Sequence, residues 1–170
     1  MSDTIRSAAA ATSPKFVMER TYRASVDELW ELWTTKEGFE SWFAPEGSRV
    51  EVHSLELRPG GELLYTSSAT TLDQIDFLKT LGLPAAHEER LRFTKLEAPR
   101  HLTCLLLLDF IPGVDAYEVE INVDLEGDAD RTTMVMTSGV MHSERFTELA
   151  ELGWESQLRN MARALSEKQR

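Results

Sequence analysis

The chain has 170 residues, of which 42% are hydrophobic and 28% are charged, and its formal net charge is −11. A single globular domain of this size buries most of its apolar surface without disulfides or metals. The negative charge argues against nucleic acid and against anionic membranes as partners, because both attract basic surfaces. No segment approaches the ~20 apolar residues of a membrane span, and we expect a soluble cytoplasmic protein.

The single cysteine, Cys104, allows no internal disulfide, which fits a reducing compartment. Its sequence neighbours are Leu102 and the four leucines at 105–108. We therefore expect a buried structural thiol and not a nucleophile.

Residues 1–14 contain an alanine run but no hydrophobic segment typical of a secretory signal, and they are predicted to be a disordered tail. Residues 15–166 are predicted to form one domain. Its first element is expected to be a strand over 15–22, where Phe16, Met18 and Tyr22 share one face.

Two short helices are predicted next. Ser25 and Glu28 have the spacing of a capping box, in which each side chain bonds a free backbone N–H of the other residue. The same spacing recurs at 34–37 and opens the second helix, which Pro45 ends. Three of the four tryptophans lie within 30–42, and we interpret them as anchors that fix the helices to a sheet.

From Arg49 onward the apolar residues recur with a period of two, which predicts strands. Residues 117–125 alternate most regularly, with one apolar and one polar face, as is typical of an antiparallel sheet. A Pro-Gly-Gly turn at 59–61 joins the first two of these strands into a hairpin. The predicted strands are 49–57, 62–68, 88–96, 101–110, 117–125 and 131–140.

One segment, 71–86, interrupts the strands. Its leucines and isoleucine recur at intervals of three, which predicts a helical insertion ending near Gly82 and Pro84. The insertion is interpreted as a lid, a dimer contact or simple padding.

The last segment, 144–165, reads as an amphipathic helix of about six turns. Two residues on its apolar face do not fit. Gly153 weakens a helix interior by about 1 kcal/mol relative to alanine, and a buried Gln157 amide without partners costs about 1–3 kcal/mol. Either the helix is packed very closely there, or it faces something other than protein.

Antiparallel strands with helices segregated from them indicate the α+β class. Only the terminal helix is long enough to cover the apolar face of the predicted sheet.

The chain also carries an ordered series of short motifs: Ala24-Ser25-x-Asp27-Glu28-Leu29-Trp30, Trp42-Phe43-x-Pro45, Leu57-x-Pro59-Gly60-Gly61-Glu62, Glu97-Ala98-Pro99-Arg100-His101-Leu102, Arg131-Thr132 followed by Gly139, and Gly153-Trp154.

In these motifs the chain resembles the START-like (SRPBCC, birch-pollen-allergen-like) superfamily over about residues 15–165. Within it, the chain is most similar to the AHSA-type bacterial proteins named for the activator of the heat-shock-protein-90 ATPase. The resemblance implies a helix-grip fold, in which a curved antiparallel sheet of about seven strands wraps around the C-terminal helix and two short helices close one end. It also implies a hydrophobic cavity between sheet and helix. The insertion at 71–86 departs from the family pattern at the mouth of this cavity.

The residues expected to line the cavity are aromatic and methionine side chains with a few polar groups, as in small-molecule pockets. The same residues would serve equally well as plain core. Gly153 would make room for a ligand, Gln157 would orient it, and Phe77 is a candidate lid. The full set of candidate ligand-binding residues is Trp42, Phe43, Tyr65, Phe93, Phe110, Met136, Gly153, Trp154, Gln157 and Met161.

We identify no catalytic constellation in the sequence, and we expect no cofactor and no metal site. The four histidines are scattered without the short spacing of metal ligands. His53, His101 and Asp109 lie on strands, and any of them that faced an apolar pocket could serve acid–base chemistry.

Three functions remain open. The first is binding of an apolar small molecule between the sheet and 144–165. The second is a cyclase or hydratase type of enzyme acting on such a ligand. The third is a chaperone-regulating interaction module. Homodimerisation through the insertion or the outer sheet face is also left open.

Overall fold

The computed structural model describes residues 14–168, so the predicted tail at 1–14 lies outside the described residues apart from Pro14. Within this range the chain forms seven strands and four helices in the predicted order. They are β1 (Lys15–Tyr22), α2 (Val26–Thr34), α3 (Lys36–Trp42), β2 (Ser48–Leu55), β3 (Glu62–Ala69), α4 (Leu72–Thr80), β4 (Ala86–Glu97), β5 (His101–Leu108), β6 (Tyr117–Gly127), β7 (Thr132–Gly139) and α5 (Glu144–Lys168).

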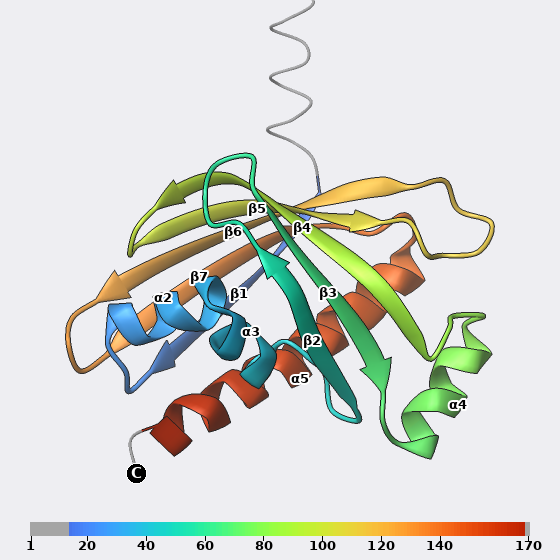
Figure 1. The fold of residues 1–170 in the computed structure, drawn as a ribbon, viewed down its shortest axis with the longest axis horizontal. Helices are drawn as coiled ribbons and strands as arrows, with labels where there is room; N and C mark the ends of the chain where they lie inside the picture. Colours follow the sequence, from blue (N-terminus) through green and yellow to red (C-terminus); the bar gives the residue numbers. More distant parts are fainter. Residues whose placement is uncertain (1–13, 169–170) are drawn as a thin grey trace, which may run out of the picture.

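The strands form one sheet in the order β1-β7-β6-β5-β4-β3-β2, and every neighbouring pair is antiparallel. The sheet curves around α5, which runs obliquely across its concave face, and α2 and α3 lie beside the C-terminal half of α5 (Figure 1). The predicted α+β class and helix-grip fold are confirmed.

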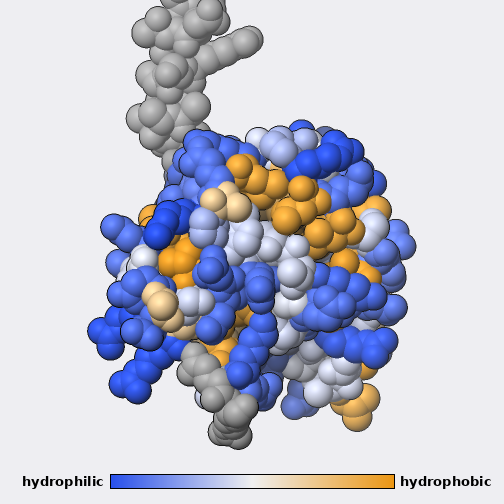
Figure 2. All heavy atoms as spheres, turned by 60° about the vertical axis from the view of Figure 1, so that its left-hand side comes forward, coloured by the Kyte–Doolittle hydropathy of each residue, from blue (hydrophilic) through white to orange (hydrophobic). Residues whose placement is uncertain are grey.

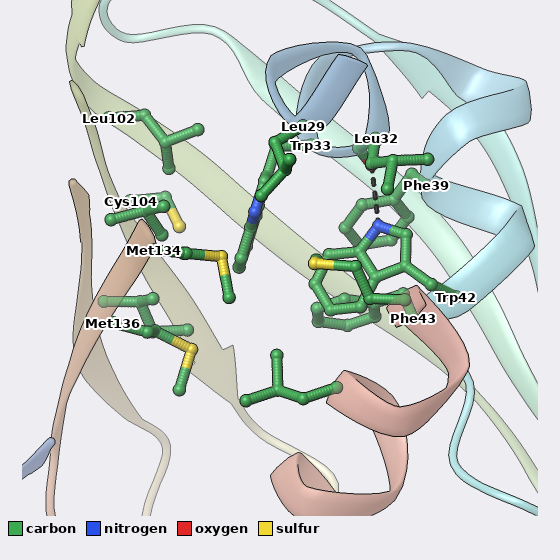
Figure 3. Packing of buried hydrophobic residues seen from close by; sticks show 14 of the residues in the cluster. Leu29, Leu32, Trp33, Phe39, Trp42, Phe43, Leu102, Cys104, Met134 and Met136 are labelled. Atoms are coloured by element: carbon green, nitrogen blue, oxygen red, sulfur yellow. Dashed lines mark hydrogen bonds between the residues drawn. The ribbon is translucent and has the colours of Figure 1, made fainter. Parts of the chain in front are cut away.

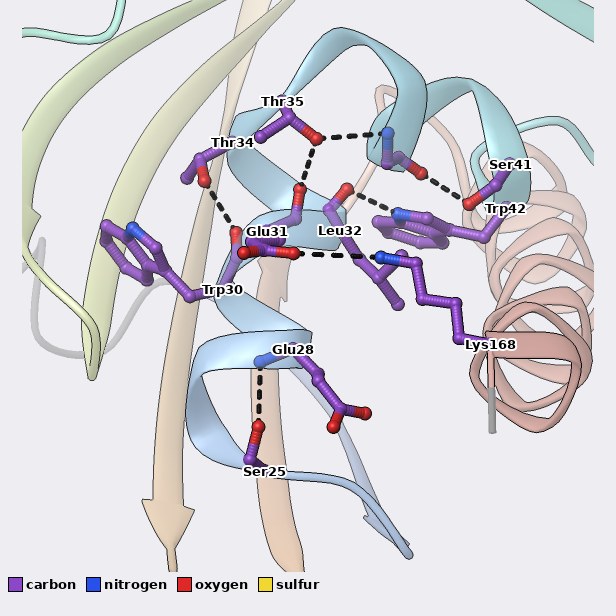
Figure 4. Close-up of polar contacts among 11 residues, drawn as sticks. Ser25, Glu28, Trp30, Glu31, Leu32, Thr34, Thr35, Ser41, Trp42 and Lys168 are labelled. Atoms are coloured by element: carbon purple, nitrogen blue, oxygen red, sulfur yellow. Dashed lines mark hydrogen bonds and ion pairs between the residues drawn. The ribbon is translucent and has the colours of Figure 1, made fainter. Parts of the chain in front are cut away.

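The two short helices are capped by hydroxyl side chains (Figure 4). The Ser25 hydroxyl accepts a hydrogen bond from the Glu28 backbone N–H at 3.1 Å. The α3 cap is Thr35, not Thr34 as the sequence spacing predicted, and its hydroxyl accepts from the Gly38 N–H at 3.0 Å. Thr34 is buried in the last turn of α2 and donates to the Trp30 carbonyl at 2.6 Å, so its hydroxyl is already committed.

Aromatic side chains of α2 and α3 fill the space between these helices, the sheet and α5 (Figure 3). Trp33 and Trp42 meet edge to face with ring centroids 4.7 Å apart. The Trp42 indole N–H donates to the Leu32 carbonyl at 2.7 Å, which satisfies its only polar atom. Opposite them, Met134 and Met136 of β7 are fully buried. The predicted role of the tryptophans as anchors therefore holds for Trp33 and Trp42.

The helix α5 is buried unevenly along its length. Trp154, Leu158, Met161 and Leu165 of the C-terminal part are buried in the main hydrophobic cluster. In the N-terminal part, Phe146, Leu149, Ala150 and Gly153 are only partly buried, and Leu152 is exposed. The apolar face that the sequence predicts for α5 is therefore fully buried against other residues only in the C-terminal half of the helix.

The insertion contains α4, capped by the Thr71 hydroxyl, which accepts from the Gln74 N–H at 3.2 Å. None of the residues of α4, all of them within the described part of the chain, is buried. Its exposed side chains include Leu72 and Phe77. In Figure 1 the helix stands at one corner of the sheet, beyond the ends of β3 and β4.

The surface is predominantly polar. Hydrophilic residues cover most of the face drawn in Figure 2, and hydrophobic residues gather in a band across its upper part and in smaller patches. Across residues 14–168, none of the helices combines the length and the apolar character that a membrane span requires.

Candidate functional site

A cavity of about 250 Å³ lies between the inner face of the sheet and the N-terminal half of α5. The helix contributes Phe146, Leu149, Ala150, Gly153, Trp154 and Gln157 to its wall. Strands β2 to β5 contribute residues of their inner face, and α4 with the loop after it contributes Gln74, Leu78, Leu81 and Leu83. The insertion therefore forms part of the wall.

The cavity separates two hydrophobic clusters. The main cluster includes Phe43, Val50 and Trp154, and the second is built on Leu108 and Ile111 with Phe110, Met141 and Phe146 against it. Members of both clusters line the cavity. Leu106, which also lines the cavity, packs against both clusters, so they meet on the sheet and leave the space between the sheet and α5 open. Concave surfaces with largely apolar walls of this kind bind apolar molecules.

Gly153 lies in the part of α5 that lines the cavity, and the space beside its Cα is open. A Cβ atom placed on this residue would meet no heavy atom within 4 Å. Close packing, the first of the two explanations for a glycine on the apolar face, is therefore ruled out. The absent side chain enlarges the cavity.

Gln157 has two roles in the structure. It lines the cavity, and its side-chain amide donates a hydrogen bond to the carbonyl oxygen of Phe43. One turn later, Asn160 donates to the Ala44 carbonyl at 2.7 Å. The amide of Gln157 is therefore not an unpaired polar group in the apolar stripe, because it fixes the end of α3 against α5.

Six of the ten candidate ligand-binding residues line the cavity: Phe43, Tyr65, Phe110, Gly153, Trp154 and Gln157. The other four, Trp42, Phe93, Met136 and Met161, are at most 2% exposed and belong to the main hydrophobic cluster. Phe77, the candidate lid, is 43% exposed and lies outside the lining, where Leu78 contributes instead.

Sequence reasoning missed five polar residues of the wall, of which His87 and Glu89 are titratable; the others are Ser48, Ser67 and Gln74. Nε2 of His87 lies 3.2 Å from Oε1 of Glu89, and both side chains are 14% exposed. The imidazole stacks on Phe110 with ring centroids 4.0 Å apart. The strand β4 begins at Ala86 and not at 88 as predicted, which brings His87 into the sheet opposite Ser67.

Tyr65 lies opposite Glu89 in the register of β3 and β4 and is 1% exposed. Burial raises the pKa of Tyr65 well above its ordinary value, and the neighbouring Glu89 carboxylate raises it further. The Glu89 carboxylate acts on the tyrosine hydroxyl through its charge and as a nearby hydrogen-bond acceptor, although no group in residues 14–168 meets the strict geometry of a hydrogen bond to this hydroxyl. The hydroxyl therefore stays protonated and is available as a donor.

The three residues predicted as candidates for acid–base chemistry lie elsewhere. Nε2 of His53 is 2.6 Å from the Thr66 hydroxyl, and Nδ1 of His101 is 2.6 Å from an Asp124 carboxylate oxygen. Asp109 is exposed. None of the three lines the cavity beside α5. For His53 the strand parity was not readable from sequence, because an irregularity between Val52 and Ser54 breaks the alternation of β2, and Asp109 lies beyond the end of β5, not within the predicted strand 101–110.

Cys104 is 1% exposed, as predicted. Burial, together with the charge of Glu120, raises the pKa of its thiol to about 12. Since the thiolate is the reactive form, this side chain is suited to packing and not to nucleophilic chemistry. Within residues 14–168 no group of three or more His, Cys, Asp or Glu side chains is arranged to hold a metal ion.

Two other hollows lie outside the helix–sheet interface. One, of about 220 Å³, is lined mainly by outward residues of β2 to β5 such as His53, Leu64 and Arg90. The other, of about 330 Å³, lies beside the loop after α3 and is lined by charged residues such as Glu40 and Arg163. Only the cavity beside α5 combines apolar walls with a few polar groups, and it is the candidate site.

Comparison with known proteins gives the same fold and a family. Residues 23–166 match the family described as "Activator of Hsp90 ATPase homolog 1-like protein". No sequence among the curated proteins matches the chain.

Similar solved structures include protein CV1439 from Chromobacterium violaceum, at 16% identity and a TM-score of 0.70, over 89% of this chain and 96% of that one. A protein from Arthrobacter aurescens is 23% identical with a TM-score of 0.68, over 90% and 86% of the two chains. The AHSA1-like protein from Aeromonas hydrophila is 17% identical with a TM-score of 0.64, over 91% and 94%.

At these identities the solved structures establish the fold alone, whereas the family match covers most of the chain. The AHSA-type resemblance of the sequence motifs is confirmed. The chain belongs to the family of proteins like activator of Hsp90 ATPase homolog 1.

Proposed function

We propose that this protein binds an apolar small molecule in the cavity between the sheet and the N-terminal half of α5. The observation that carries the proposal is the position of Gly153, whose absent side chain leaves open space in an otherwise apolar wall. A sequence under pressure only for stability would gain about 1 kcal/mol from alanine at such a helix position. The glycine instead preserves volume for a ligand.

The size of the cavity bounds the ligand. An apolar cavity of about 150 Å³ holds one benzene ring, and pockets for drug-sized ligands begin at about 300 Å³. The cavity here, of about 250 Å³, falls between these values. Its ligand is therefore the size of a substituted single ring or of two fused rings.

The walls suit a flat apolar molecule. Phe43 and Trp154 meet nearly at right angles, with ring centroids 5.6 Å apart, and Phe110 closes the opposite side beside His87. Aromatic faces bury large areas in a fixed geometry, which favours a ring-shaped ligand.

The proposal is tested with 2-methylnaphthalene, whose binding to the purified protein is followed by NMR titration of backbone amides. We expect the largest shifts at Gly153 and its neighbours on α5. Gly153→Phe fills the cavity and should weaken binding at least tenfold, and Gly153→Ala, which adds a single methyl group to the same space, should weaken it by a smaller factor. Unchanged binding in Gly153→Phe, or shifts confined to the outer sheet face, would exclude this site.

Native mass spectrometry of the protein purified under gentle conditions supplies a second measurement. Co-purification of a small apolar compound with the original chain, and its loss from Gly153→Phe, is the expected result.

A further inference from the structure

The cavity has one charged end, on β4. His87 and Glu89 lie on the same face of this strand as Leu91 and Phe93, which are 2% exposed and face the core. Both side chains therefore project inward and line the cavity. Tyr65 on β3 is the direct cross-strand partner of Glu89.

This end of the cavity carries negative charge without a strong cation. Among the described residues that line the cavity, Glu89 is the only carboxylate, and none is a lysine or an arginine. The nearest arginine in the strand, Arg90, points to the outer face, where its Nε lies 2.9 Å from Glu62. The side chain paired with Glu89 is His87, whose Nε2 lies 3.2 Å from Oε1 of the carboxylate.

Two buried polar atoms near the Glu89 carboxylate lack a hydrogen-bond partner in the described part of the chain. The Tyr65 hydroxyl and Nδ1 of His87 are buried and have no hydrogen-bond partner within residues 14–168. Most buried polar atoms in folded proteins do have a partner, so unpaired atoms at the wall of a cavity point to a group that is still to be supplied. An amine or a hydroxyl head group suits this cluster because the Glu89 carboxylate accepts its hydrogen bond, whereas a second carboxylate would place two acceptors side by side.

The remaining walls favour the same kind of ligand. Phe43, Phe110 and Trp154 present aromatic rings to the cavity, and aromatic faces attract cations. The net charge of −11 also draws positively charged molecules toward the protein and repels anions.

We propose that the cavity recognises an apolar molecule through one hydrogen-bond-donating head group, a protonated amine or a hydroxyl, held at Glu89 beside His87 and Tyr65, and that it rejects apolar carboxylates. This inference rests on the proposed function and names the class of ligand for the same cavity. Fatty acids and aromatic acids are excluded because their carboxylates would meet Glu89 with no cation between them.

The test compares four probes that share one ring system: 2-methylnaphthalene, 2-naphthalenemethanol, 2-naphthylmethylamine and 2-naphthoic acid. Dissociation constants are measured by calorimetry at neutral pH, and the site is checked by the NMR signal of Gly153. We expect the alcohol and the amine to bind at least threefold and tenfold more tightly than 2-methylnaphthalene, respectively, and the acid to bind at least tenfold more weakly.

Glu89→Gln removes the charge while keeping the shape of the side chain. It should abolish the preference for the amine and improve binding of the acid, with little change for 2-methylnaphthalene. The matched control is Glu88→Gln, which makes the same change in net charge one residue away on the opposite face of β4. The control should keep the order of affinities of the original chain.

The outcomes separate the two proposals. If 2-methylnaphthalene binds beside Gly153 but the acid binds as tightly as the amine, the head-group inference is wrong and the proposed function stands. Equal effects of Glu88→Gln and Glu89→Gln on the order of affinities would mean that the net charge alone sets the selectivity, and this result would also overturn the inference. If none of the probes binds in the cavity, both proposals fail.

Discussion

The side-chain amide of Gln157 donates a hydrogen bond to the carbonyl oxygen of Phe43, the residue that caps the C-terminus of α3. The last carbonyls of a helix have no partner within the helix, and next to an apolar cavity such groups are costly to leave unpaired. Gln157 and, one turn later, Asn160 satisfy two consecutive carbonyls of this kind. The wall of the cavity is thereby joined to the tightly packed aromatic core.

We predict that Gln157→Leu lowers the free energy of unfolding by about 1–2 kcal/mol, because it removes the donor and leaves the Phe43 carbonyl unpaired. Urea unfolding followed by tryptophan fluorescence measures the change. Gln74→Leu, at a second glutamine of the cavity wall but on α4, is the control and should stay within about 0.5 kcal/mol. A loss of equal size in both variants would contradict the role given to the Gln157 amide.

Two helical glycines should respond in opposite ways to alanine. Gly153→Ala is expected to raise the free energy of unfolding by about 0.5–1 kcal/mol, because the new methyl group enters open space and alanine favours the helix. Gly38→Ala is expected to lower it by roughly 1–3 kcal/mol, because its Cβ would collide with the Glu31 carbonyl oxygen. Thermal unfolding of both variants checks the prediction, which fails if Gly153→Ala is the less stable of the two.

The three tyrosines of the chain, Tyr22, Tyr65 and Tyr117, all have raised pKa values, chiefly because of burial. For Tyr22 the pKa rises from 10.0 to about 12. Between pH 10 and about pH 12 the folded state binds more protons than the unfolded state. The free energy of unfolding contributed below pH 10 therefore decreases as the pH rises toward 12. The decrease is about 1.4 kcal/mol per pH unit for a tyrosine that stays protonated in the folded state.

Urea unfolding at a series of pH values, together with ultraviolet absorbance of tyrosinate, measures this effect. Tyr22→Phe should flatten the decline between pH 10 and 12. A tyrosinate signal that develops fully near pH 10 in the folded protein would show that the hydroxyls are not held protonated.

Cys104 should react with a thiol reagent roughly 100-fold or more slowly in the folded protein than in urea, because burial raises the pKa of its thiol to about 12 and the thiolate is the reacting form. The release of coloured product from Ellman's reagent gives both rates. Similar rates in the two conditions would contradict the buried position of this side chain.

The sequence was sufficient for the fold because its signals are local and periodic. Alternation over 117–125 identified a strand with one solvent-exposed face, the Ser25 hydroxyl marked where α2 begins, and apolar residues at intervals of three indicated α4. The misfits Gly153 and Gln157 could be recognised because helical periodicity assigns each residue to a face.

Periodicity assigns a face but not a position along the length of an element. Trp154 and Met161 lie on the same face of α5, yet Trp154 lines the cavity and Met161 is fully buried in the core. For this reason Trp42, Phe93, Met136 and Met161 could not be separated from the wall of the cavity by sequence alone.

His87 and Glu89 could have been found. Leu91 and Phe93 lie two residues apart in the predicted strand 88–96, and the same interval toward the N-terminus places Glu89 and then His87 on their face. The predicted start of the strand at 88 hid this continuation, since polar residues at the beginning of a strand resemble a loop.

The uneven burial of α5 has a consequence for substitutions along its length. Leu158, Met161 and Leu165 are fixed by the core, so change there is costly, whereas Phe146, Leu149, Ala150 and Gly153 line the cavity and lie outside the main hydrophobic cluster. Substitutions of the wall residues in the first half of α5 should therefore change the shape of the cavity while the second half keeps the chain folded. A library randomised over 146–153 is expected to contain mostly folded variants that differ in ligand preference.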